Sequence, residues 1–281
     1  MKSKKIKTIA GALLIAMTGA IFTGCGSSGA EDDTNSNGST TISISGSTSV
    51  GPLMEKVAEV YEEKNPNVVL EIQQPGSGTG IKNAIDGIAE IGMSSRDLAS
   101  DEAGKVNGTE IAYDGVAVLV NPKNTAENLT IEQIKKIYTG EITNWSEVGG
   151  KDAPIVVISR EEGSGTRSAF QEIVGYESEE MLKDAMISDG SGAVQTAVAG
   201  NENAIGYASF EYINSSVKAL NVEGVEPTAE NVKNSTYKIS RPFLLVTKED
   251  TLTEEGQKLI DFILSDEGQK IVEENKLITI K

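Results

Sequence analysis

Short apolar runs alternate with amphipathic stretches along most of the chain. Ile42 to Ser45 alternates apolar and polar residues, which predicts a half-buried strand. Pro52 to Lys64 repeats apolar residues at helical spacing with a proline near its first turn, which predicts a helix. A strand over Val68 to Gln73, a helix over Thr79 to Ile88 and a strand over Glu90 to Met93 follow. This βαβαβ order is typical of a parallel sheet.

A second block of elements begins after a longer apolar strand, Ile111 to Val120, which ends at the turn signal and candidate hinge Asn121-Pro122. The pattern then predicts helices over 131–138, 164–174, 193–199, 254–264 and 267–274, and strands over 154–159, 204–208 and 242–247. We therefore expect an α/β protein of two lobes, residues 41–120 plus 239–281 and residues 121–238. The closing helices are expected to return to the first lobe.

The beginning of the chain has the features of an export signal. Four lysines within the first seven residues precede the apolar run Ile9 to Phe22, which predicts a secretory signal over residues 1–24. Phe22-Thr23-Gly24-Cys25 resembles a lipobox, so Cys25 is the expected lipid-modified residue, and an ordinary signal with an incidental cysteine is the alternative. Residues 25–40 then read as the anchor and a flexible tether of small polar residues. These features predict a protein anchored by lipid on the extracytoplasmic face of the cell membrane.

Composition removes several classes of function. The 281 residues contain no histidine, which excludes a Ser-His-Asp triad, a histidine metal ligand and a histidine general base. The single cysteine excludes an intramolecular disulfide and a thiolate-rich metal site. A formal net charge of −17 argues against a nucleic-acid partner. We expect neither a metal nor a cofactor.

Four small-residue loops lie between predicted strands and helices. They are Gly46–Gly51 (first loop), Gly76–Gly80 (second loop), Gly92–Arg96 (third loop) and Arg160–Arg167 (fourth loop). Free N–H groups and a positive dipole at a helix start, together with hydroxyl donors, make such loops suitable for an anion. Each loop alone is also explained by helix capping. No dinucleotide fingerprint, P-loop or nucleophile elbow accompanies them, which favours a free anion over a nucleotide.

The chain resembles a known family through a set of strings that occur in order over residues 41–281. They are GSTSVGPLMEKVAEVYEEKNP, GSGTGIKNAIDGIAEIGMSSR, YTGEITNW, SREEGSGTRSAF and NAIGYASF. These strings are similar to those of the phosphate-binding proteins, PstS type, of the ABC phosphate importer. The resemblance implies a two-lobe type II periplasmic-binding-protein fold that binds inorganic phosphate in its cleft. It also implies a monomer that performs no chemistry and delivers phosphate to the permease and ATPase subunits of a transporter.

The resemblance also implies which residues contact phosphate. Hydroxyl and backbone donors are expected from Thr48, Ser49, Ser77, Ser95, Ser164, Gly165 and Thr166, and a charge-assisted contact from Arg160. Ser47 and Ser94 are further candidates in the same loops. Arg96 and Arg167 could belong to the site or to ion pairs elsewhere.

One position departs from the family pattern. Ser95 stands where better-known members have an aspartate that accepts the proton of hydrogen phosphate. A serine hydroxyl can also accept. Asp114 interrupts an apolar strand and is the candidate substitute acceptor, although it could equally cap a turn or bond to the backbone.

Other functions stay open on the sequence. Because Ser95 replaces the aspartate of better-known members, the ligand could also be another tetrahedral oxyanion, such as sulfate, molybdate or tungstate. A phosphate-ester hydrolase would need an activated nucleophile or metal cluster that the sequence does not supply. An adhesive or sensor lipoprotein is the remaining alternative.

Overall fold

The computed structural model describes residues 39–280, so the predicted signal segment, Cys25 and the tether up to residue 38 lie outside the described residues. The strands are β1 Thr40–Gly46, β2 Val68–Gln73, β3 Ile91–Ser94, β4 Asn107–Val120, β5 Asn128–Leu129, β6 Val156–Arg160, β7 Met186–Ser188, β8 Ala204–Ser209, β9 Lys218–Ala219, β10 Asn221–Val222 and β11 Ser240–Thr247. The helices are α1 Gly51–Lys64, α2 Ser77–Ile85, α3 Ile131–Thr139, α4 Gly165–Val174, α5 Ser191–Gly200, α6 Ala229–Lys233, α7 Glu254–Leu264 and α8 Asp266–Glu274, with 3-10 turns η1 Trp145–Val148 and η2 Phe210–Tyr212. None of these helices is long and apolar enough to cross a bilayer.

The strongly periodic segments form the elements that the sequence predicts. In α1, Leu53, Val57 and Tyr61 recur every four residues and all three are buried. The structure adds β5, β7, β9, β10 and α6, which are two to five residues long and have too few apolar positions for a periodic signal. β4 begins at Asn107, four residues before the predicted start; its first four residues lack the apolar side chains on which the prediction rests, and three of them are exposed.

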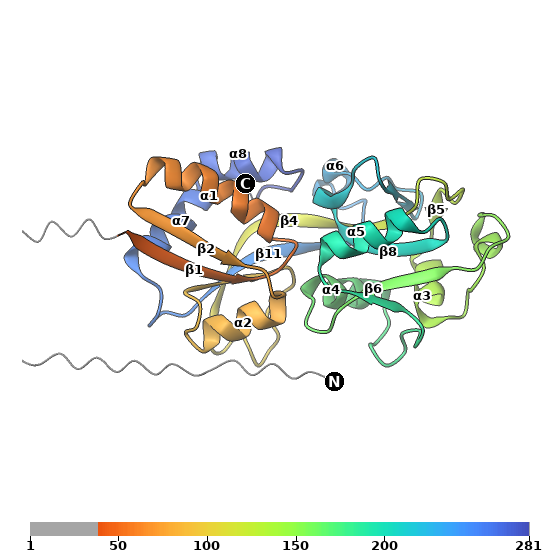
Figure 1. Cartoon of the computed structure of the whole chain (residues 1–281), viewed down its shortest axis with the longest axis horizontal. Helices are drawn as coiled ribbons and strands as arrows, with labels where there is room; N and C mark the ends of the chain where they lie inside the picture. Colours follow the sequence, from red (N-terminus) through yellow and green to blue (C-terminus); the bar gives the residue numbers. More distant parts are fainter. Residues whose placement is uncertain (1–38, 281) are drawn as a thin grey trace, which may run out of the picture. The chain divides into compact units, whose positions relative to one another are not determined.

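Most of the strands form one mixed sheet in the order β2-β1-β3-β11-β4-β8-β6-β7, with β9 paired to β4 beside this path, and β10 and β5 form a separate two-stranded sheet. β1 pairs in parallel with β2 and β3, as the βαβαβ pattern requires. β11 runs antiparallel between β3 and β4, and β4 runs antiparallel to β8. Figure 1 shows β4 and β11 passing between the two halves of the fold.

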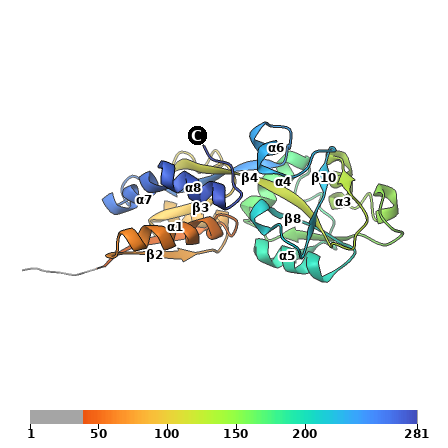
Figure 2. The ribbon, with the colours of Figure 1, turned by 90° about the horizontal axis from the view of Figure 1, so that it is seen from above.

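Two hydrophobic cores define the two lobes. The first lobe has its main core between the sheet and α1, α7 and α8, which lie side by side in Figure 2, and a smaller cluster under α2 on the opposite face. β11 serves both faces, because Phe243 and Leu245 enter the main core while Leu244 and Val246 enter the smaller one. The second lobe has a single large core that includes Trp145, Phe170 and Tyr207.

The border between the cores does not fall at residue 120. Ile111 and Ala112 of β4 belong to the first core, whereas Val116 to Val120 of the same strand belong to the second. Ile239 and Ile278 also lie in the second core. A strand of 14 residues is long enough to cross from one lobe to the other, so one strand contributes to both.

A buried ion pair joins the two crossing strands near this border. Asp114 of β4 is fully buried and its Oδ2 accepts from Arg241 Nη2 of β11 at 3.0 Å. Its other oxygen, Oδ1, accepts from Ser209 Oγ at 2.8 Å. Glu211 lies beside this pair, and among the described residues neither of its buried carboxylate oxygens has a hydrogen-bond partner. Burial, and then the charge of Asp114, raise the pKa of Glu211 to about 9, against the opposing charges of Arg241 and Lys276.

The free energy of unfolding is therefore expected to fall as pH rises and Glu211 ionises. Because its folded pKa lies above its unfolded value, the protonated form stabilises the fold at acid pH, and this contribution is lost between about pH 4.5 and pH 9. We expect Glu211→Gln to raise the free energy of unfolding by about 2–4 kcal/mol at about pH 8, with little effect at about pH 4. Denaturant titrations at both pH values measure the difference.

The matched control is Glu59→Gln, which removes a carboxylate that pairs with Lys56 on an exposed face of α1. It is expected to change stability by less than about 0.5 kcal/mol. A Glu211→Gln variant whose gain in stability over wild type is no larger at about pH 8 than at about pH 4 would contradict the protonated state of this side chain.

Candidate functional site

Four helix starts and one loop bring small polar residues from both lobes to one place. The first lobe contributes the start of α1, the start of α2 and the third loop, which continues without a helix. The second lobe contributes the starts of α4 and α5. The buried residues of this group are Ser49, Ser77, Ser95, Arg160, Ser164, Thr166 and Ser191, and Thr48 is half-buried beside them.

The hydroxyls of the first loop contact the second lobe directly. Ser49 Oγ lies 3.0 Å from Thr166 Oγ1 and 2.9 Å from Ser191 Oγ. Arg160 Nη1 donates to Ser191 Oγ at 3.0 Å and to Thr166 Oγ1 at 3.3 Å. Arg160 Nη2 donates to Thr48 Oγ1 at 3.1 Å. We call Thr48, Ser49, Thr166, Ser191 and the guanidinium of Arg160 the hydroxyl cluster.

A second pair of hydroxyls lies against the start of α4. Ser77 Oγ is 3.2 Å from Ser95 Oγ and accepts from the Ser95 N–H at 3.2 Å. A Cβ atom at Gly165 would lie 2.4 Å from Ser77 Oγ and 2.9 Å from Ser95 Oγ. Glycine is thus required at Gly165, because the two lobes approach each other here with no space for a methyl group.

Arg160 is held by both its backbone and its side chain. Its N–H donates to Tyr207 Oη at 3.3 Å, and its carbonyl accepts from Arg167 Nη1 at 3.2 Å. Tyr207 in turn is fixed by a 2.8 Å contact with Ser159 Oγ and by stacking on Phe170. These contacts fix the position from which the buried guanidinium faces the hydroxyls.

Glu161 pairs with the edge of the Arg160 guanidinium that faces away from the hydroxyl cluster. Its carboxylate accepts from Arg160 Nε at 2.7 Å and from Nη2 at 2.6 Å, and it also accepts from the Gly190 N–H at 3.1 Å. Burial disfavours the ionised carboxylate, but the hydrogen bonds and charge of Arg160 outweigh burial and lower the pKa of Glu161. The pair leaves Nη1 and the second N–H of Nη2 directed at the hydroxyls.

Three serines among the sequence candidates bond to their own loops. Ser47 Oγ accepts from the N–H groups of Ser49 and Val50, at the start of α1. Ser94 Oγ donates to the Arg96 carbonyl at 2.8 Å. Ser164 Oγ caps α4 by accepting from the Arg167 N–H at 3.3 Å. These hydroxyls shape the loops, and their role toward a ligand stays a prediction.

Asp114, the candidate substitute acceptor, has its hydrogen-bond partners outside the hydroxyl cluster, and its role toward a ligand stays a prediction. Its two oxygens accept from Arg241 and Ser209, and Oδ1 also lies 3.4 Å from the Phe210 N–H. None of the hydrogen bonds found for Asp114 in the described chain reaches the hydroxyl cluster. The aspartate neutralises the buried Arg241, so its oxygens are occupied.

The two other candidate arginines have structural partners. Both ends of the Arg96 guanidinium pair with Glu102 at 2.8 Å, which folds the segment after the third loop back on itself. Arg167 supports the Arg160 carbonyl and donates to Ser178 Oγ at 3.1 Å. Arg160 is therefore the cation that the described residues direct at the hydroxyl cluster.

The motifs in the sequence do not point to Ser191 or to the pairing role of Glu161. Ser191 is fully buried and begins α5, directly after Gly190, whose φ is +85°. The segment Gly190-Ser191-Gly192 is a small-residue loop between a strand and a helix, like the four loops recognised in the sequence. The strand before it, β7, has three residues, which is too short for a periodic pattern of apolar residues. The sequence pattern therefore does not indicate this segment, which we call the fifth loop.

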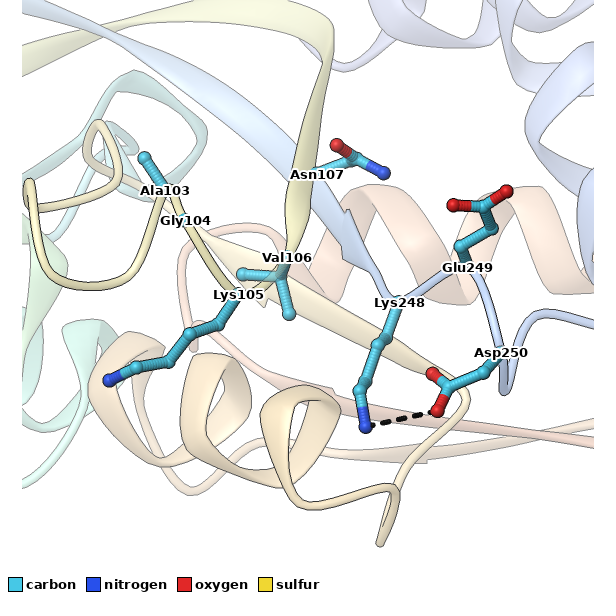
Figure 3. A pocket seen from close by; sticks show the side chains of 8 residues that line it. All are labelled: Ala103, Gly104, Lys105, Val106, Asn107, Lys248, Glu249 and Asp250. Carbon is cyan, nitrogen blue, oxygen red and sulfur yellow. Dashed lines mark ion pairs between the residues drawn. The ribbon is translucent and has the colours of Figure 1, made fainter.

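A separate surface hollow, drawn in Figure 3, lies at the outer ends of β4 and β11. Lys248 and Asp250 form an ion pair of 3.3 Å beside it. Its lining comes from residues 103–107 and 248–250, so it shares no residue with the hydroxyl cluster.

The arrangement is suited to holding a small oxyanion. Hydroxyls and helix-start N–H groups donate from both lobes, and one buried guanidinium supplies positive charge. Among the described residues, no group of three or more histidine, cysteine, aspartate or glutamate side chains could hold a metal ion. Within the part of the chain that the structure describes, the hydroxyls of Ser49, Thr166 and Ser191 contact one another, Arg160 and Thr48, and none contacts a side chain that could act as a base.

A two-lobe fold with hydroxyl, N–H and guanidinium donors gathered between its lobes is typical of solute-binding proteins. Comparison with known proteins supports this class. The PBP superfamily domain matches residues 31–267. The phosphate-binding protein PstS of Bacillus subtilis is 32% identical over 97% of this chain and 92% of its own length. The chain belongs to the PstS-type phosphate-binding proteins.

Solved structures give the same result. One, described as a phosphate ABC transporter substrate-binding protein with bound phosphate from Clostridium perfringens, is 58% identical with a TM-score of 0.85. The match covers 86% of this chain and 100% of that one. An ABC-type phosphate transport receptor from Vibrio cholerae is 37% identical with a TM-score of 0.73, over 85% of this chain and 99% of its own.

The close approach at Gly165 can be tested by Gly165→Ala. The added methyl group is expected to push Ser77 and Ser95 away from α4 and so to separate the lobes. Hydrogen exchange of the Gly78 amide, which donates to the Gly163 carbonyl across the lobes at 3.0 Å, should then become roughly tenfold faster.

Gly200→Ala is the control, because a Cβ at this helical position meets nothing within 4 Å. It should leave the exchange of the Gly78 amide unchanged. Equal exchange in the two variants would mean that the lobes do not approach each other at Gly165.

Proposed function

We propose that this protein captures inorganic phosphate outside the cytoplasm and delivers it to an ABC importer, without chemical conversion of the ligand. The observation that carries the proposal is the convergence of hydroxyls from both lobes on the buried guanidinium of Arg160. Membership of the PstS-type family supports it, as does the phosphate bound in the Clostridium perfringens relative. Both lobes must come together to complete such a site, so binding and lobe closure are coupled.

The residues proposed to contact phosphate come from five loops. They are Thr48, Ser49, Ser77, Ser95, Arg160, Ser164, Gly165, Thr166 and, from the fifth loop, Ser191. Arg160 supplies the charge through Nη1 and Nη2, while Glu161 holds the opposite edge of its guanidinium. Bonds between an arginine and a phosphate oxygen are stronger than those between neutral groups.

Discrimination between phosphate and sulfate is proposed to rest on hydroxyl acceptors. The Asp114 carboxylate pairs with Arg241, and the Glu161 carboxylate pairs with the edge of Arg160 that faces away from the hydroxyl cluster. We therefore propose that neither carboxylate receives a proton from the ligand. Ser95, beside Ser77, can accept as well as donate. A hydroxyl acceptor is neutral, so it rejects a fully ionised oxyanion less strongly than a carboxylate does.

The localisation and partners extend the proposal beyond the described residues. PstS-type proteins are extracytoplasmic, and the lipobox-like segment before Cys25 supports a lipid anchor there. We propose that a monomer, tethered by residues 25–40, docks on the permease and ATPase subunits of the importer. The lobes are proposed to be residues 41–120 with 239–281 and residues 121–238, as the sequence predicts, except that Val116 to Val120, Ile239 and Ile278 pack in the core of the second lobe.

Two alternative functions are less well supported. A phosphate-ester hydrolase would need an activated nucleophile, and the family is one of substrate-binding proteins. Sulfate or molybdate remains the alternative ligand, because Ser95 replaces the acceptor aspartate of better-known members.

Calorimetric titration tests the ligand. The purified protein, freed of bound anion by partial unfolding and refolding, is expected to bind one phosphate per chain and to bind sulfate about 10–100-fold more weakly, because sulfate leaves an acceptor without a donor. Ser95→Asp should widen this ratio by adding a charged acceptor. Sulfate or molybdate binding as tight as phosphate binding would assign another oxyanion to the site.

Arg160→Ala tests the centre of the site. It is expected to weaken phosphate binding by at least about 2 kcal/mol, because a charge-assisted contact is lost where water is excluded. Arg96→Ala is the control, since Arg96 pairs with Glu102 outside the hydroxyl cluster. Equal phosphate affinities in these two variants would remove Arg160 from the site.

A further inference from the structure

Tyr212 makes a hydrogen bond between the lobes at the edge of the site. It lies at the end of η2 in the second lobe, and its Oη donates to the carbonyl oxygen of Thr48 in the first loop at 2.9 Å. The bond therefore engages the backbone of a residue whose hydroxyl belongs to the hydroxyl cluster. Neither the family resemblance nor the loop pattern pointed to this side chain.

Tyr212 is fixed within its own lobe. Its carbonyl accepts from the Gln195 side-chain amide of α5, and its ring lies beside Gly192, where a Cβ would be 3.7 Å from Cε1. The ring also packs against the core of the second lobe. The hydroxyl is the part of this side chain that bonds to the first lobe. The hydrogen bond can therefore form only when the two lobes are close together.

Thr48 receives hydrogen bonds from three elements of the second lobe. Its Oγ1 accepts from Arg160 Nη2 of β6 at 3.1 Å, and the N–H of Ser191 in α5 lies 3.4 Å from the same atom. Its carbonyl accepts from Tyr212 of η2. Arg160 and Ser191 belong to the group proposed to contact phosphate. Tyr212 differs from them because it bonds to the carbonyl and to none of the cluster hydroxyls.

We propose that Tyr212 is a positioning residue that holds the two lobes closed over the bound anion without contacting the anion itself. The inference rests on the phosphate binding proposed above and adds a residue that sets how long phosphate stays bound. The phenol remains a donor at neutral pH, since burial and the neighbouring Glu211 raise the pKa of Tyr212 to about 12.

The physical consequence follows from the population of the closed form. An apparent dissociation constant equals the intrinsic one divided by the fraction of molecules that can close. Loss of the Tyr212 hydrogen bond lowers that fraction and leaves the anion-facing donors intact. Phosphate must leave through an opened form, so the release rate rises while the association rate is preserved.

The experiment compares Tyr212→Phe with Tyr61→Phe in the purified full chain. Tyr61 Oη donates to Glu255 within the first lobe. This control therefore removes a phenol hydroxyl whose hydrogen bond does not connect the two lobes. Radiolabelled phosphate release, chased with unlabelled phosphate, is expected to be about 3–10-fold faster for Tyr212→Phe than for wild type, the range for one neutral hydrogen bond. Tyr61→Phe should release phosphate at the wild-type rate.

Two further measurements separate positioning from general stability. The unfolding temperature of ligand-free Tyr212→Phe should equal that of wild type, because the lost bond forms only when the lobes meet. Small-angle scattering with subsaturating phosphate should show a larger radius of gyration than wild type at equal occupancy. A second variant, Gln195→Ala, removes the amide that anchors the Tyr212 carbonyl and should also speed release.

Each failure has its own meaning. Wild-type protein that gives no heat with phosphate would overturn the proposed function, and this inference with it. Tight phosphate binding by wild type, with unchanged release in Tyr212→Phe, would overturn this inference alone. A lowered unfolding temperature of ligand-free Tyr212→Phe that accounts for its lost affinity would also overturn it, because the role would then be structural.

Discussion

The position of the buried Arg160 guanidinium is the constraint on which the site depends. A cation excluded from water is stable only where its donors are matched and its charge is balanced. Glu161 meets this requirement on one edge, and hydroxyls from both lobes meet it on the other. Tyr207 and Arg167 hold the backbone of Arg160, from which the guanidinium extends toward the hydroxyls.

The fold supplies this constraint by sharing its sheet between two cores. β4 and β11 lie antiparallel to each other and pass from one lobe toward the other, and the buried pair of Asp114 and Arg241 links them between the lobes. The helix starts of each lobe then meet at the border, where hydroxyls replace apolar side chains. A polar border can open and close at low cost because its groups can also bond to water, whereas an apolar one would remain shut.

The two buried acidic groups near the border have different roles. Asp114 is paired with Arg241 and stabilises the crossing of the strands. Glu211 beside it lacks a partner in the described chain, and burial keeps it protonated near neutral pH. An aspartate that interrupts an apolar strand looked in the sequence like a ligand acceptor. Its use in an ion pair could not be foreseen, because Arg241 is 127 residues away along the chain.

The periodic elements, the two-lobe α/β class and the loops rich in serine, threonine and glycine could be predicted from the sequence, because these features depend on local spacing and on residue type. Motifs in the first, second and fourth loops pointed to Ser49, Ser77, Arg160 and Thr166, which the fold brings together. Which hydroxyls face one another, and which cap their own helices, depends on how the chain folds in three dimensions. The tertiary structure also added Ser191 and Tyr212 and placed the border of the cores within β4, because these features depend on contacts between residues far apart in the sequence.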